Sequence, residues 1–317
     1  MLLLFTFLFS LNTFAAISLD SKDNVLIQRF INEVSSTQSI PKKWLEAQFQ
    51  GLHTSEQAIS FIQKPRESLT WHKYRKLFLT KKRIEKGRIF LERHTDLFTS
   101  QERQYGIPKS IVAAIIGMET NYGLTKGDFN ALEVLSTLSF YYVPRHRFFQ
   151  TELKALITEA WHKKWDLHQV KASYAGALGI PQFMPSNIPL YSKSADAKLP
   201  SNIFNNPLDA ISSVFNYLHA HGHWHANQPV LKSIKLTSHQ YAYLMKNHPG
   251  REAIELTPKL RKILNLRRQG EPTCWLLLSK HKNYREAFIG FHNFASIMRY
   301  NNSAHYAHSV YDLAMTF

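Results

Sequence analysis

The chain has 317 residues, enough for one large domain or two smaller ones with a substantial core. Apolar residues make up 44% of it and aromatic residues 13%, a composition that excludes an intrinsically disordered protein. Lys and Arg outnumber Asp and Glu by 39 to 23, and the formal charge of +16 indicates an anionic partner: nucleic acid, an acidic membrane surface or an acidic polymer.

Residues 1–16 are typical of a secretory signal peptide. An apolar run over residues 2–11 is interrupted only by two hydroxyl residues, and Ala15-Ala16 offers small residues for cleavage, although no Lys or Arg precedes the run. No Cys follows it at which a lipid could be attached, so we predict a secreted protein that is not lipid-anchored. Cys274 is the only cysteine, which excludes an internal disulfide framework.

The region that follows is predicted to be helical. Apolar residues keep helical spacing near residues 25–34 and in part over residues 84–97, so we expect amphipathic helices across residues 23–105. Pro108 then precedes a new helix, where a proline is well tolerated.

Glu119 lies in a stretch, residues 110–123, that carries no other charge. It continues an apolar stripe at i, i+3, i+4 and i+7 that begins at Val112, which is one face of a helix. Burying a bare carboxylate is costly, so such a group either finds partners or takes up a proton, and a partly protonated Glu is poised as a general acid. The alternative is a Glu at a frayed helix end that points to water.

Two further helices and a tight turn follow. Residues 148–161 place apolar side chains on one helix face, and another helix is predicted to start at Asn206-Pro207. Between them, residues 173–186 contain two glycines and two prolines, which indicates a segment that brings backbone close to a ligand.

After about residue 225 the pattern weakens. Short strands are expected at residues 274–278, 287–291 and 295–299, and Ser303 is expected to cap a last helix. The histidines at 219, 221, 223 and 225 alternate, which leaves open a metal site or a His-rich surface turn.

Three sequence blocks together resemble the lytic murein transglycosylase B family, which cleaves bacterial peptidoglycan. The blocks are residues 116–123 with 135–140, residues 173–179 with 182–186, and residues 206–211 with 216–217 and 220–222. Residues 299–303 and 71–75 also look like the family's pattern, so the match runs in order over nearly the whole mature chain.

The resemblance implies a mainly α protein with a lysozyme-like helical catalytic core, a flanking helical region and a small late β-containing lobe. We expect a signal peptide at 1–16, an N-terminal helical region at 17–105, the catalytic core at 106–225, and at 226–317 a C-terminal region whose final helix completes the site.

Carried over residue by residue, the resemblance makes Glu119 the single catalytic acid/base. The substrate-binding residues that it implies beside Glu119 are Ser173, Gln182, Tyr217, Tyr300 and Asn301, and those along the saccharide groove are Tyr74, Arg145, Phe183 and Met184. Phe183 and Met184 could instead belong to the core, and Arg145 could be a solvated surface charge.

The chemistry implied by the resemblance needs one carboxylate. The 2-acetamido group of N-acetylmuramic acid would act as internal nucleophile, and Glu119 would protonate the glycosidic oxygen and then deprotonate the C6 hydroxyl, closing a 1,6-anhydro ring. Asp209 is the only other acidic residue in the three blocks. It follows Pro207 at a helix start, where the dipole stabilises a negative charge, so we interpret it as structural.

The sequence departs from its relatives at two places. Residues 192–200 replace an acidic calcium-binding loop of some relatives and offer Asp196 alone as a carboxylate, so we predict no metal site and no cofactor. His146 stands where relatives have a second arginine.

Peptidoglycan glycan strands are the expected partner of a monomeric periplasmic enzyme that the basic charge could hold to the anionic envelope. No nucleic-acid-binding motif accompanies the scattered basic residues. A peptidoglycan-binding protein without activity and, less favoured, a basic nucleic-acid-binding protein remain the alternatives.

Overall fold

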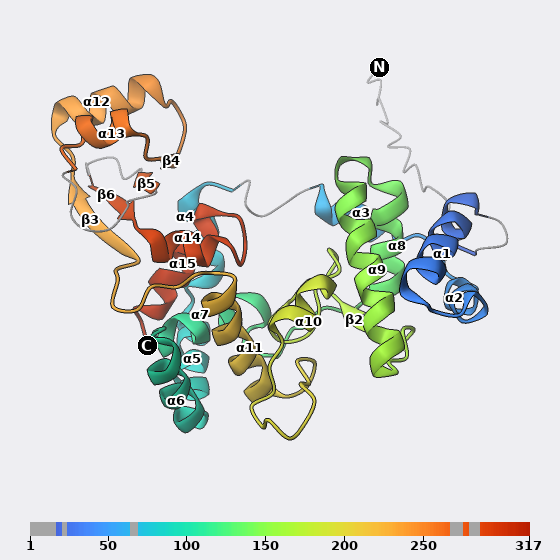
Figure 1. The fold of residues 1–317 in the computed structure, drawn as a ribbon. Helices are drawn as coiled ribbons and strands as arrows, with labels where there is room; N and C mark the ends of the chain where they lie inside the picture. The colour runs from blue at the N-terminus through green and yellow to red at the C-terminus, as the bar shows by residue number, and fades with distance from the viewer. Residues whose placement is uncertain (1–16, 21–23, 64–68, 267–274, 279–285) are drawn as a thin grey trace, which may run out of the picture. The chain divides into compact units, whose positions relative to one another are not determined.

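The structure is a computed structural model that describes residues 17–20, 24–63, 69–266, 275–278 and 286–317 (Figure 1). The predicted leader and Cys274 lie outside the described residues. The chain divides into two compact units: the first takes the residues up to Gln63 with Phe129–Val170 and Tyr174–Gly176, and the second takes Lys64–Asp128, Lys171–Ser173 and Ala177–Phe317. None of the helices described in the structure is long and apolar enough to cross a membrane.

The first unit is helical. It contains α1 (Val25–Gln38), α2 (Lys42–Phe49), α3 (Glu56–Ile62), the short β1 (Phe129–Asn130), α8 (Ala131–Tyr141), the 3-10 turn η2 (Val143–Arg145) and α9 (His146–Lys163). Apolar residues along one face of α9 are buried, as the sequence predicts for residues 148–161.

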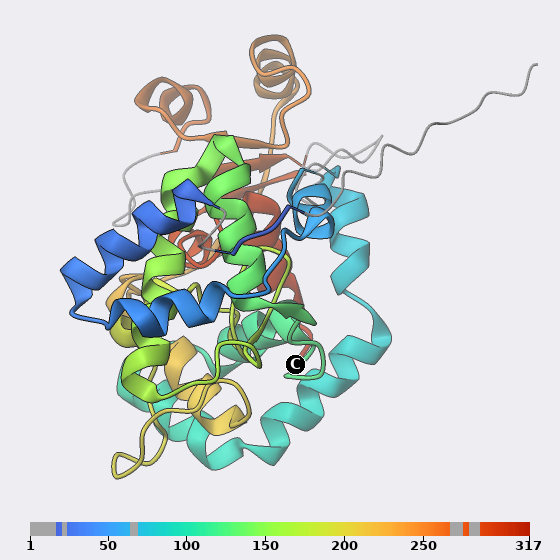
Figure 2. The same cartoon turned by 90° about the vertical axis from the view of Figure 1, so that its right-hand side faces the viewer.

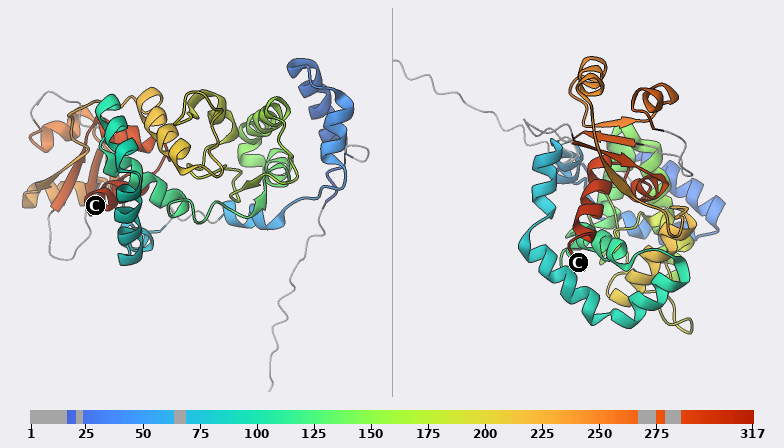
Figure 3. Two further views of the ribbon diagram at one scale, coloured as in Figure 1. Left: turned by 90° about the horizontal axis from the view of Figure 1, so that it is seen from below. Right: turned by 90° about the vertical axis from the view of Figure 1, so that its left-hand side faces the viewer.

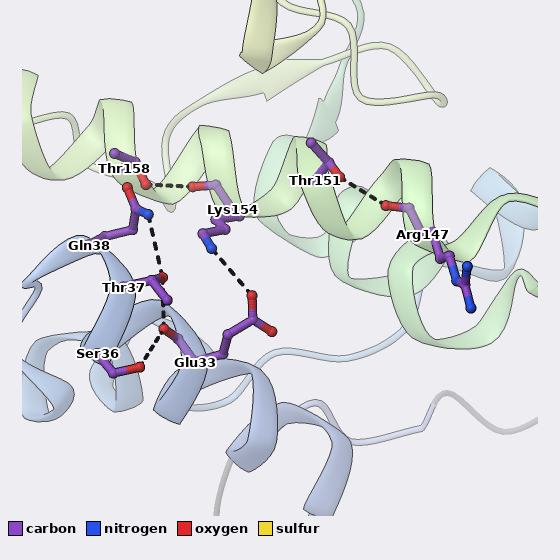
Figure 4. Close-up of polar contacts among 8 residues, drawn as sticks. All are labelled: Glu33, Ser36, Thr37, Gln38, Arg147, Thr151, Lys154 and Thr158. Atoms are coloured by element: carbon purple, nitrogen blue, oxygen red, sulfur yellow. Dashed lines mark hydrogen bonds and ion pairs between the residues drawn. The ribbon is translucent and has the colours of Figure 1, made fainter.

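Polar contacts join α1 to α8 and to α9 in this unit. The Asn24 side chain caps α1 and also donates to the Tyr141 hydroxyl at 2.8 Å. Lys154 of α9 reaches Glu33 of α1 at 3.2 Å (Figure 4). The exposed pair adds little to stability, so the buried apolar faces hold this unit together.

The second unit carries the remaining elements. Its helices are α4 (Trp71–Phe78), α5 (Lys81–Arg93), α6 (Thr95–Tyr105), α7 (Lys109–Thr120), η3 (Pro185–Asn187), α10 (Ile188–Tyr191), α11 (Pro207–Ala220), α12 (Ser238–Asn247), α13 (Pro258–Ile263), α14 (His292–Met298) and α15 (Ala304–Ala314), and its strands are β2 (Lys171–Ala172), β3 (Leu231–Lys235), β4 (Ala253–Glu255), β5 (Trp275–Leu278) and β6 (Glu286–Gly290).

Helix α7 is the central element of the second unit. Every residue from Ile111 to Met118 is buried, because α5, α6, α11 and α15 pack around it (Figure 2). The prediction of a single buried face was therefore too narrow: with no charge between Lys109 and Glu119, all sides of this part of α7 can enter the core.

Strands β3 to β6 form a four-stranded antiparallel sheet in the order β3-β6-β5-β4. Leu276 and Leu278 of β5 face the core shared with α12 and α13, whereas Leu277 between them joins the core of α14 and α15. The sheet therefore lies between two helical layers, as Figure 3 shows in its right-hand view.

The late region was only partly predicted. Strands β5 and β6 match the expected strands near residues 275–278 and 287–290, and Ser303 caps α15 as predicted. The strand expected at residues 295–299 is wrong, because this segment belongs to α14 and its following residue. Phe294, Ile297 and Met298 are buried at i, i+3 and i+4, which is helical spacing.

Candidate active site

Glu119 lies in the last turn of α7, where Asn121 ends the helix with a left-handed backbone conformation (φ 50°). The side chain is half-buried, and its Oε1 accepts a hydrogen bond from the Tyr306 hydroxyl at 2.5 Å. Tyr306 is 3% exposed and lies in the first turn of α15. The C-terminal end of a helix disfavours a negative charge, so this carboxylate is positioned where its ionised form needs such a donor.

Two more tyrosines complete an aromatic group beside Glu119. The Tyr300 hydroxyl donates to the Pro181 carbonyl at 2.5 Å, the Tyr217 hydroxyl donates to the Arg299 carbonyl at 2.7 Å, and the two ring centroids are 4.8 Å apart.

These phenols stay neutral. Burial raises the pKa of Tyr300 and Tyr306 well above their ordinary value near 10, and the charge of Glu119 adds to the shift. Burial also raises the pKa of Tyr217; Tyr191 and Glu119 raise it further, and the charge of Arg299 opposes the shift. The tyrosine hydroxyls near Glu119 therefore keep their protons at neutral pH.

The glycine-rich turn predicted from the sequence packs against this aromatic group. Leu178 forms isolated bridges with Ala172 and Phe183, and the Ser173 hydroxyl accepts the backbone N–H of Ala177 at 3.1 Å. Gly179 has a φ of +70°, and a Cβ there would lie 2.6 Å from the Ile203 carbonyl oxygen, so only glycine fits.

Gln182 also adopts a positive φ of 53° in this turn. Its side-chain nitrogen donates to the carbonyls of Lys126 and Gly179 at 3.1 and 2.9 Å. The next residue, Phe183, is 2% exposed, and its ring centroid is 5.4 Å from that of Tyr217. The turn therefore packs beside Tyr217 and Tyr300, two of the substrate-binding residues predicted from the sequence.

The remaining predicted site residues differ in their surroundings. Tyr74 is 1% exposed, and its ring lies 5.9 Å from that of His305, next to Tyr306 in sequence. Met184 and Asn301 are half-buried. Arg145 belongs to the first unit, where it is exposed and lies 4.3 Å above the Phe148 ring.

Sequence reasoning missed Tyr306. The sequence predicted only a last helix after Ser303, in which Tyr306 is buried. The available signal was the cap: Ser303 accepts the Tyr306 N–H at 3.2 Å, which places Tyr306 in the first helical turn. Only the tertiary fold reveals that its hydroxyl meets Glu119.

Asp209 has a different environment from Glu119. It is 2% exposed, and its two carboxylate oxygens accept the backbone N–H groups of Ala195 and Asn202 at 2.9 and 2.7 Å. The residue therefore fixes the loop that precedes α11.

The alternating histidines do not converge on one point. His219 packs against Tyr105 at 5.2 Å, and His221 is bonded to Tyr191. His225 stacks on His292 at 3.9 Å between ring centroids. Within the described part of the chain, no group of three or more His, Cys, Asp or Glu side chains is placed to hold a metal ion.

Comparisons with known proteins agree over most of the chain. The family model described as a transglycosylase SLT domain matches residues 22–315. The membrane-bound lytic murein transglycosylase B of Escherichia coli (strain K12) is 33% identical over 252 residues, which are 77% of this chain and 66% of that protein.

Solved structures share the fold. The catenated lytic transglycosylase SltB1 of Pseudomonas aeruginosa superposes with a TM-score of 0.82 at 29% identity, covering 92% of this chain and 97% of that one. SltB3 of Pseudomonas aeruginosa, solved with NAG-NAM-pentapeptide, gives a TM-score of 0.74 at 26% identity, covering 91% and 78%. The mainly helical, lysozyme-like fold expected from the sequence is thereby confirmed.

Proposed function

Because the chain belongs to the family of the transglycosylase SLT domain, we propose that it is a lytic transglycosylase that cleaves the β-1,4 bond between N-acetylmuramic acid and N-acetylglucosamine in peptidoglycan. One observation carries the proposed chemistry. Among the residues that the structure describes, Glu119 is the only carboxylate whose charge raises the pKa of all three buried tyrosines, Tyr217, Tyr300 and Tyr306. A single acid among neutral hydroxyls suits a reaction in which the substrate supplies its own nucleophile.

The first step is a protonation by Glu119. The protonated carboxyl gives its proton to the glycosidic oxygen, while the 2-acetamido group of N-acetylmuramic acid attacks the anomeric carbon and the leaving sugar departs. The Tyr306 hydroxyl, which holds Glu119 Oε1 at 2.5 Å, restrains the carboxyl and stabilises the carboxylate that this step leaves behind.

In the second step the carboxylate acts as a base. It removes the proton of the C6 hydroxyl, and the C6 oxygen displaces the acetamido group from the anomeric carbon to close the 1,6-anhydro ring. Glu119 is again protonated, and no water is consumed. A tyrosine hydroxyl can donate to the carboxylate and accept from the carboxylic acid, so Tyr306 is compatible with both states of Glu119.

The neighbouring polar residues are proposed to orient the sugar. Ser173, Gln182, Tyr217, Tyr300 and Asn301 carry hydroxyl and amide groups that suit the acetamido group and the sugar hydroxyls. Gln182 donates to two backbone carbonyls, so its side chain is already held in one orientation.

The groove residues fall into two groups. The burial of Tyr74 and Phe183 favours a supporting position under the groove, whereas the exposed Arg145 and half-buried Met184 have surface for a ligand.

A periplasmic location fits the proposed substrate and the signal peptide predicted at residues 1–16. The Escherichia coli relative is named a membrane-bound protein. A monomer held partly by its +16 charge to the anionic envelope is our proposal for this chain.

Mass spectrometry of sacculi digested by the purified protein tests the function. We expect fragments that end in 1,6-anhydro-N-acetylmuramic acid. Fragments heavier by one water, with a reducing end, would show hydrolysis and overturn the mechanism. Binding without release of fragments would favour a peptidoglycan-binding protein instead.

A further inference from the structure

A polar corner adjoins the tyrosines of the candidate active site. It consists of Tyr191, His221 and Arg299, all in the second unit. Arg299 directly precedes Tyr300, and its carbonyl accepts the Tyr217 hydroxyl at 2.7 Å. The ring centroids of Tyr191 and His221 each lie 5.0 Å from that of Tyr217. We refer to these three residues as the Arg299 corner.

The guanidinium of Arg299 is restrained by a hydrogen bond to a backbone carbonyl, and no carboxylate of the described residues pairs with its charge. Its Nη1 donates to the His221 carbonyl at 2.8 Å, which fixes the side chain across the end of α11. The side chain is exposed, and no carboxylate of the described residues forms an ion pair with it. A restrained guanidinium with remaining N–H donors is suited to bind a planar anion.

His221 contributes a neutral imidazole to the corner. Partial burial lowers the pKa of His221, and the nearby Arg299 and His223 lower it further. The Tyr191 hydroxyl lies 3.1 Å from its Nδ1, which orients the ring. Because the ring is uncharged at neutral pH, Arg299 supplies the positive charge of the corner and His221 supplies a polar, aromatic wall.

The proposed substrate carries its negative charge away from the bond that is cut. The hydroxyl and acetamido groups of the two sugars are uncharged, and the lactyl group of the muramic sugar is an amide wherever a peptide stem is attached. The carboxylates lie on the stem. An arginine beside the tyrosines proposed to bind the sugar is therefore suited to bind a carboxylate of the peptide stem, because the glycan that carries the stem offers no charged group.

We propose that the Arg299 corner binds a carboxylate of the peptide stem, with the guanidinium as the charged donor and His221 as its neighbour, so that the enzyme prefers strands that carry peptides. This inference rests on the proposed function. It assigns Arg299 a binding role and no step of the reaction itself.

The test compares four proteins on three substrates. The proteins are wild type, Arg299→Gln, Arg299→Lys and, as matched control, Arg93→Gln, whose arginine is exposed in the last turn of α5. The substrates are native sacculi, sacculi whose stem carboxylates have been converted to amides, and glycan strands freed of peptides by an amidase, which leaves only the lactyl carboxylate.

On native sacculi we expect Arg299→Gln to lower kcat/KM roughly three- to tenfold, as for one exposed charge-assisted contact. Arg299→Lys should lie between this variant and wild type, and Arg93→Gln should match wild type. On both altered substrates, wild type and Arg299→Gln should have the same kcat/KM.

Three results would overturn the proposal. The first is an Arg299→Gln protein equal to wild type on native sacculi. The second is a loss of the same size on all three substrates, which would mean that Arg299 only positions Tyr217. The third is a loss that persists on amidase-treated strands but not on amidated sacculi, which would assign the corner to the lactyl carboxylate.

Failure of the proposed function gives a different pattern. The wild-type protein would then release no fragments from any substrate. Binding of a free stem pentapeptide to wild type and to Arg299→Gln still decides the inference in that case. Equal affinities would refute the proposed binding of the stem by Arg299, and weaker binding by the variant would support it.

Discussion

Two carboxylates in the second unit, Glu119 and Asp209, show how the hydrogen-bond partners of an acidic side chain limit the protonation states that it can adopt. Glu119 lies in the last turn of α7 and accepts a hydrogen bond from the Tyr306 hydroxyl, whereas Asp209 lies in the first turn of α11 and accepts hydrogen bonds from two backbone N–H groups. A hydroxyl can donate or accept, so Glu119 keeps a partner in either protonation state. A backbone N–H only donates, so Asp209 must remain ionised to keep both bonds. We propose that the first arrangement serves catalysis, whereas the second fixes a loop.

Glu119→Gln should have the largest effect. Glutamine keeps the size of the side chain but cannot exchange a proton, so we expect turnover of sacculi to fall by about 10²–10⁴-fold. The melting temperature should stay close to that of wild type. Glu85→Gln, an exposed residue of α5, serves as the matched control. Near-normal release of muropeptides by a folded Glu119→Gln protein would refute the assignment.

Asp209→Asn should lower stability rather than chemistry. An amide can accept at one atom only, and its NH₂ would face an N–H donor of the loop, so we expect a loss of about 3 kcal/mol in the free energy of unfolding. Urea denaturation measures this loss. Asp196→Asn, on the exposed part of the same loop, should cost less than about 0.5 kcal/mol.

A loss of activity without a loss of stability in Asp209→Asn would contradict the distinction between a catalytic Glu119 and a structural Asp209. An Asp209→Asn protein with unchanged stability and lost activity would mean that Asp209 takes part in the reaction. The site would then hold two acids, and a hydrolytic mechanism would return as an option.

The sequence predicted the helix position of Glu119, but it did not predict the hydrogen-bond partners of Asp209. The spacing of apolar residues up to Glu119 is local information, and α7 forms where this spacing indicates. Asp209 was interpreted as structural because of the helix dipole, and Asn206 does cap α11 as a helix start requires. The bonds from Ala195 and Asn202 come from a loop whose path depends on the tertiary fold.

The β-containing lobe was the least predictable part. The chain segments of β3 and β6 pair although they are distant in sequence, and β3 alternates only weakly between buried and exposed residues. Residues 295–299 are apolar enough for a strand, but their buried positions follow helical spacing once Phe294 is included. Short apolar runs do not distinguish these alternatives without their partners.

Tyr306→Phe sharpens the comparison at the site itself. The variant keeps the ring, which is buried between helices, and removes only the hydroxyl that holds Glu119. Loss of one hydrogen bond to a charged group predicts a decrease in kcat of roughly 10–10²-fold with little change in fold. Tyr311→Phe, on the same helix, is the matched control and should leave kcat unchanged. Equal kcat values for the two variants would exclude a role of Tyr306 in positioning Glu119.

Chelation should have the smallest effect of all, because side-chain oxygens of the loop before α11, and both oxygens of Asp209 beside it, already accept hydrogen bonds. Both Asp209 oxygens accept N–H groups, Asp196 Oδ1 accepts the Lys198 N–H at 3.0 Å, and Asn202 Oδ1 accepts those of residues 204 and 205, each at 3.2 Å. Calcium requires several oxygen ligands, and binding here would first break these bonds. We therefore expect EDTA and added calcium to leave the melting temperature and the rate unchanged. A melting temperature that falls with EDTA and recovers with calcium, but not with magnesium, would show that this loop rearranges around an ion, and Asp209 would then be a ligand instead of a clamp.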